Sequence, residues 1–100
     1  MTIDFHAEVD KRKEALMEDL FGLLRINSER DDSKADEKHP FGPGPVKALE
    51  HFLALAERDG YKTRNIDNYA GDFEFGQGDE VLGIFAHLDV VPAGSGWDTD

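Results

Sequence analysis

The chain has 100 residues, 39% of them hydrophobic, which is enough to build the core of one small domain. Its formal net charge of −11 argues against nucleic acid or an anionic membrane as a partner, since both require a basic surface. It has no cysteine, so a bound metal would have to be held by His, Asp or Glu. The N-terminus lacks the pattern of a secretory signal and no apolar run is long enough to span a bilayer, so we expect a cytoplasmic protein.

Two amphipathic helices are predicted in the first 60 residues. Residues 4–27 read as one long helix with Asp4 as its N-cap. Its apolar stripe repeats at spacings of 3, 4 and 7 and consists of Phe5, Val9, Leu16, Leu20, Leu23 and Leu24. Residues 28–42 are rich in charges and turn formers and are predicted to be a loop. A second helix should begin at Pro43 and end at Gly60.

Three strands are predicted after the second helix, which makes the fold class α/β. They cover residues 61–66, 72–75 and 81–86, with a turn at 68–71 and a tight connection at 76–79 whose glycines adopt positive φ. The third, Val81–Ala86, is apolar at every position except Gly83. A continuous apolar run of this kind is typical of a strand that is buried on both faces of an α/β sheet.

Two helices cannot cover both faces of such a sheet. One face or one edge would remain exposed, so we expect these residues to be the first part of a larger α/β domain. We also expect that the isolated chain is not a monomeric, cooperatively melting protein, because its apolar surfaces would be uncovered.

His87 and Asp89 follow the apolar run directly. Side chains two residues apart on a strand point to the same face, so the imidazole and the carboxylate should emerge together at the strand end. Open α/β sheets present their binding crevice at this place. The spacing alone fits equally well a buried structural histidine or a metal ligand that donates its other N–H to a carboxylate. The remaining histidines are isolated and are expected to be structural or exposed: His6, His39 and His51.

Two other kinds of site are disfavoured by the sequence. A Ser-His-Asp triad using His87 and Asp89 would need a serine on a nucleophile elbow, which is not seen. A phosphate-binding loop at residues 76–79 would need a following helix, and its flanks are acidic.

The run Gly83–Gly94, followed by Gly96 and Trp97, resembles the first metal motif of the co-catalytic zinc peptidases. This superfamily also contains aminoacylases, succinyl-diaminopimelate desuccinylases and glutamate carboxypeptidases. The stretches Pro40–Pro45 and Arg58–Tyr61, together with Asn68–Gly71, are similar to the PepV-type bacterial dipeptidases.

The resemblance implies a catalytic α/β domain, with helices on a central mixed sheet and two zinc ions, into which a smaller lid domain is inserted. Residues 1–100 would then be the N-terminal part of the catalytic domain, without the lid domain. His87 matches a zinc ligand of the family, and Asp89 matches the active-site aspartate that orients that ligand. The bridging carboxylate, the glutamate general base and the other ligands lie past Asp100 in the family.

The activity implied by the resemblance is hydrolysis of dipeptides with a free N-terminus by a metal-activated water. The 100 residues alone would be inactive and would need the remainder of the same enzyme chain. Two alternatives remain open at this point. One is a related deacylase or desuccinylase, and the other is a non-catalytic module that binds a partner through the uncovered sheet.

Overall fold

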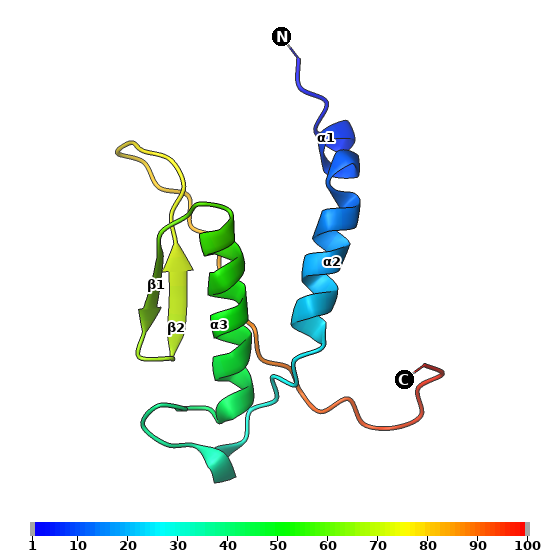
Figure 1. Ribbon diagram of the computed structural model, residues 1–100, viewed down its shortest axis with the longest axis vertical. Helices are drawn as coiled ribbons and strands as arrows, with labels where there is room; N and C mark the ends of the chain where they lie inside the picture. Colours follow the sequence, from blue (N-terminus) through cyan, green and yellow to red (C-terminus); the bar gives the residue numbers. More distant parts are fainter. Residues whose placement is uncertain (1, 100) are drawn as a thin grey trace.

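A computed structural model describes residues 2–99 and confirms the α/β class, with helices followed by a two-stranded antiparallel sheet. Its elements, in chain order, are α1 (Phe5–Lys11), α2 (Lys13–Leu24), the 3₁₀ turn η1 (Asp32–Lys34), α3 (Pro43–Arg58), β1 (Thr63–Ile66) and β2 (Ala70–Phe73). Figure 1 shows α3 standing between the β1–β2 hairpin and α2. Within residues 2–99, no helix combines the length and the hydrophobicity needed to cross a membrane.

The single helix predicted for residues 4–27 is in fact two helices, because the backbone leaves helical geometry at Arg12 (φ −106°, ψ 4°). The Arg12 guanidinium donates to the Glu8 carbonyl oxygen at 2.9 Å and to the Glu8 carboxylate at 2.8 Å. That carbonyl is the helical acceptor for the Arg12 N–H, which instead bonds to Val9 O at 2.9 Å. The break is therefore accompanied by a hydrogen bond from the Arg12 side chain to the backbone carbonyl four residues earlier. The spacing of apolar residues in the sequence gives no sign of such a bond.

Three of the other predicted helix boundaries are confirmed within a residue or two, whereas the end predicted at residue 27 falls at Leu24. Asp4 caps α1, since its Oδ1 accepts from the Ala7 N–H at 3.1 Å. Pro43 is the first residue of α3, where its missing N–H costs nothing. Gly60 follows the helix with φ +93°, the left-handed conformation expected after a helix end.

All the buried hydrophobic side chains among the described residues come from α3: Val46, Ala48, Leu49, Leu53 and Ala56. Strand β2 lies directly on this face at Gly71. A Cβ atom there would be 2.9 Å from Leu49 Cδ1 and 3.0 Å from Leu53 Cδ1, closer than ordinary van der Waals contact. The hairpin therefore packs on α3 through a position that has room only for hydrogen.

The hairpin turn falls slightly earlier than predicted. Asp67 and Asn68 have φ of +52° and +63°, and the Tyr69 N–H donates to Ile66 O at 2.9 Å. Two consecutive positive φ values characterise the type I′ turn, which matches the twist of a hairpin. The second strand consequently begins at Ala70 instead of Asp72.

The third predicted strand, Val81–Ala86, does not form in the described chain, and its predicted burial is wrong for these residues. The segment forms neither helix nor strand. Its four large apolar side chains are 87–96% exposed: Val81, Leu82, Ile84 and Phe85. A strand needs a neighbour to satisfy its N–H and C=O groups, and residues 2–99 contain no segment that pairs along it. The expectation of uncovered apolar surface is thereby confirmed.

Helices α2 and α3 are joined by a bidentate ion pair. Arg58 on α3 donates from its two Nη atoms to the Asp19 carboxylate on α2 at 2.9 and 3.0 Å. The hydrogen bond from Arg58 holds the pKa of Asp19 below its ordinary value. A second contact lies beside it, where the His51 ring of α3 packs over Gly22 of α2, leaving little room for a Cβ atom.

We predict that Asp19→Asn loosens α2 near neutral pH. The pKa of Asp19 is lower in the folded protein than in the unfolded chain. The ion pair therefore stabilises the fold at a pH above the unfolded-state pKa, and this stabilisation is lost as the pH falls through the folded-state pKa. Hydrogen exchange of α2 amides in the complete gene product should rise by no more than about fivefold at pH 7. The difference from wild type should shrink below about pH 5. Asp10→Asn on exposed α1 is the control, and a pH-independent effect of Asp19→Asn would contradict the ion-pair explanation.

Candidate functional site

His87 and Asp89 lie close together, but not at the end of a buried strand as predicted, because the run before them forms no strand within residues 2–99. His87 Nδ1 is 3.0 Å from the Asp89 backbone oxygen and 3.4 Å from Asp89 Oδ1. Both side chains are open to solvent, with 85% and 57% of their surfaces exposed. His87 Nδ1 is therefore directed at two oxygen atoms of Asp89, and Nε2 is left for an external partner.

The chemistry of this pair suits one ligand of a zinc site. A zinc-binding histidine ordinarily donates its second ring N–H to a carboxylate or a backbone carbonyl, and His87 Nδ1 is close to both. Zinc requires about four donors, however. Within residues 2–99, no three His, Asp or Glu side chains gather closely enough to hold a metal ion. The described chain can thus supply one ligand and its orienting oxygens, and further donors would have to come from elsewhere.

The residues just after α2 hold the chain beyond His87 and Asp89. Val90 donates its N–H to Ser28 O at 3.3 Å, and Glu29 forms a parallel β-bridge with Val90. Ser28 is only 4% exposed and is the buried polar residue of the described chain. The prediction of a plain loop for residues 28–42 missed this pairing, because a serine between an asparagine and a glutamate gives no sequence signal of burial.

Two glycines at the start of α3 fix the position of this segment. A Cβ atom at Gly44 would overlap the carbonyl oxygen of Asn27. Gly42 has φ +96°, and a Cβ atom there would lie 2.8 Å from Asp31 O. The Asp31 N–H also donates to Phe41 O at 3.0 Å. The N-terminus of α3 therefore presses directly on the backbone that pairs with Val90.

Arg30 follows Glu29, the residue that forms the bridge with Val90. Its Nε donates to Asp32 Oδ1 at 2.7 Å, and its guanidinium lies 5.3 Å from the centre of the Phe41 ring. The pKa of Arg30 is raised, mainly by the hydrogen bond to Asp32 and its charge, and further by the charge of Asp89. The sequence prediction did not single out this arginine.

The other histidines occupy structural or exposed positions, in line with expectation. His6 is exposed on α1. His39 Nδ1 lies 2.9 Å from Asp36 Oδ1, and this hydrogen bond lowers the pKa of Asp36. His51 is half-buried at the contact with α2, and its Nε2 finds no hydrogen-bond partner within residues 2–99.

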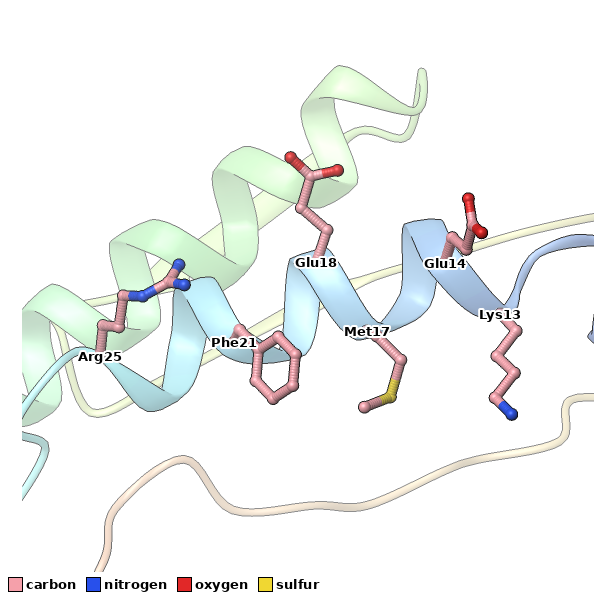
Figure 2. A pocket seen from close by; sticks show the side chains of 6 residues that line it. All are labelled: Lys13, Glu14, Met17, Glu18, Phe21 and Arg25. Carbon is pink, nitrogen blue, oxygen red and sulfur yellow. The ribbon is translucent and has the colours of Figure 1, made fainter. Parts of the chain in front are cut away.

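A shallow groove of about 530 Å³ follows α2 away from this site. Figure 2 shows Met17 and Phe21 extending to one side of the helix, with Glu14 and Glu18 on the other side. Lys13 and Arg25 complete its lining. The groove contains neither His87 nor Asp89, so it is separate from the candidate metal ligands.

Comparison with known proteins gives close relatives but no family model that matches. Proteins named "putative dipeptidase" from Staphylococcus haemolyticus (strain JCSC1435), Staphylococcus saprophyticus and Staphylococcus aureus (strain USA300) are each 50% identical to the chain over 93 residues. The match covers 93% of the chain but only 20% of each relative, so the chain spans about one fifth of the length of these relatives. These names agree with the dipeptidase part of the resemblance and do not favour a deacylase or a binding module.

We predict that Gly44→Ala loosens the segment that pairs with Val90. The added methyl group would push the Asn27 carbonyl away from α3 and lengthen the hydrogen bond between Val90 and Ser28. Overpacking of this kind costs about 1–3 kcal/mol. The opening free energy of amides near Val90, measured by hydrogen exchange in the complete gene product, should fall by about that amount.

Gly22→Ala is the matched control for this substitution. It also adds a methyl group within a helix, but its neighbour is the His51 ring, a side chain that can move. It should be neutral or slightly stabilising, because alanine favours helix over glycine by about 1 kcal/mol. Equal effects of the two substitutions would show that the Gly44 contact has no special importance.

Proposed function

We propose that residues 1–100 form part of a cytoplasmic, zinc-dependent dipeptidase that cleaves dipeptides with a free N-terminus. The observation that carries this proposal is the 50% identity, over 93% of the chain, to proteins with a dipeptidase name. Since the chain spans about one fifth of those relatives, the activity would belong to the complete gene product. The remaining catalytic groups would come from residues outside the 100 described by this sequence.

In this proposal, His87 holds one of two zinc ions through Nε2, and Asp89 orients the imidazole. Bound zinc supplies polarisation of a carbonyl oxygen and acidification of a water molecule. The oxygens near Nδ1 favour the tautomer with its proton on that atom, which keeps the Nε2 lone pair available. The exposure of the His87 ring supports the proposal, because a ligand must remain accessible to the rest of a site.

His87→Ala in the complete gene product should remove one zinc ligand and abolish dipeptide hydrolysis. Zinc content after dialysis, measured by elemental analysis, should fall by about one ion per chain, because fewer donors than zinc prefers would remain. His6→Ala, on exposed α1, is the control and should retain both zinc and activity. Full zinc occupancy in the His87→Ala protein would disprove the ligand assignment.

The isolated 100-residue chain should neither hydrolyse dipeptides in the presence of zinc nor remain monomeric. It offers too few metal ligands within residues 2–99, and the apolar side chains of residues 81–85 are almost fully exposed. Size-exclusion chromatography and a dipeptide hydrolysis assay, run beside the complete gene product, test both expectations. A monomeric and active 100-residue protein would overturn the proposal that the site needs further residues.

A further inference from the structure

Helix α2 is attached to α3 through a side that carries a carboxylate and a glycine. Asp19 accepts two hydrogen bonds from Arg58, and Gly22 lies against the His51 ring. Positions three residues apart lie on one side of a helix, so both contacts use the same side of α2. The attachment to α3 therefore leaves most of the large apolar side chains of α2 uncovered.

These large apolar side chains form a second side of α2 that is largely open within residues 2–99. Five of them are 37–62% exposed: Leu16, Met17, Leu20, Phe21 and Leu24. Spacings of three and four residues place them in two neighbouring rows along the helix. Met17 and Phe21 line the groove of about 530 Å³, and Figure 2 shows both extending from the helix. A contiguous apolar surface of this kind ordinarily marks a contact.

The segment Val81–Ala86 is tethered close to the open side of α2. Val90 donates its N–H to Ser28 O at 3.3 Å, and Ser28 comes four residues after the end of α2. Ala86 precedes Val90 by four residues, so even a fully extended chain keeps it within about 14 Å of this hydrogen bond. Figure 2 shows the pale orange chain passing on the open side of α2. The tether keeps the segment within reach of the helix, which favours a contact between the two.

The segment has two apolar faces that both need cover. Residues two apart share a face of an extended chain, so Val81 and Phe85 point one way and Leu82 and Ile84 point the other. All four side chains are 87–96% exposed. Large apolar side chains on both faces are typical of a strand in a sheet with helices on each face. Helix α2 offers an apolar surface for one of these faces.

We propose that the open side of α2 is the docking surface for Val81–Ala86 in the complete gene product, where this segment pairs as a strand and packs one face on the helix. The chain spans about one fifth of the length of its relatives, so residues outside it can supply the neighbouring strand. Packing removes two apolar surfaces from water, and it fixes His87, the next residue, relative to the end of α2. The inference rests on the longer gene product of the proposed function and not on its zinc site.

Cysteine crosslinking in the complete gene product tests the inference. Phe21→Cys is combined in turn with Val81→Cys, Leu82→Cys, Ile84→Cys and Phe85→Cys, and each protein is treated with a short bismaleimide. Because alternate residues of a strand share a face, crosslinks should form at the two positions of one face and not at the two positions of the other. The two positions that face α2 should react at least about tenfold faster than the other two, which point away across the sheet.

A matched control lies on the same helix. Glu18→Cys, on the opposite side of α2 in Figure 2, should crosslink to none of the four positions. The unsubstituted protein sets the background from any cysteine outside these residues, since the 100 residues contain none. If Phe21→Cys does not fold, Met17→Cys takes its place about one turn earlier on the same side.

The possible outcomes separate this inference from the proposed zinc site. Crosslinks on both faces of the segment, or on neither, would overturn the docking surface. A crosslink that joins two chains, which mass spectrometry distinguishes, would show that a second copy covers α2 and would also overturn it. A protein that binds no zinc but crosslinks on one face would refute the zinc site alone.

Discussion

The contact between Gly44 of α3 and the Asn27 carbonyl determines where the chain that follows α2 can lie. Helix α3 is the one element that contributes buried apolar side chains within residues 2–99, so hydrophobic burial stabilises its position more than that of any other described element. Because its first turn presses on the Asn27 backbone, Ser28 is buried with its carbonyl turned toward Val90. The position of the candidate metal residues therefore depends on α3 indirectly, through the backbone of residues 27–28 and its hydrogen bond from Val90. A glycine without room for a methyl group is the link between the core and the site.

Local chemistry made several features predictable from sequence. Asp4 caps α1, Pro43 begins α3 and Gly60 follows it, because each residue type satisfies a need of the helix end itself. The closeness of His87 and Asp89 was also predictable from local sequence, since it depends only on a separation of two residues in an extended chain. The break at Arg12 was not, because it accompanies a hydrogen bond from an arginine to its own i−4 carbonyl. The roles of zinc, His87 and Asp89 remain predictions.

Features that depend on distant residues could not be read in this way. Nothing near Ser28 in sequence indicates that its carbonyl meets Val90, and the bridge at Glu29 has no local signature. The apolar run Val81–Ala86 shows the opposite failure. Its composition correctly signals a segment suited to burial, but burial requires neighbours, and within residues 2–99 none pairs along it. The sequence pattern thus indicates which environment suits a segment, whereas strand pairing depends on which other segments lie next to it.

The order of these elements along the chain has a consequence for folding during synthesis. Helix α3 and the hairpin that packs on it occupy one continuous stretch, residues 43–73, so their mutual contacts close only short loops and can form early. The exposed apolar segment emerges just afterwards; its backbone groups find no strand partner within residues 2–99, and Phe85 is 96% exposed. A nascent chain therefore carries a finished helix–hairpin unit next to a stretch suited to adventitious strand pairing. Asp79 and Glu80 directly precede that stretch, and their negative charges would discourage such pairing between neighbouring chains.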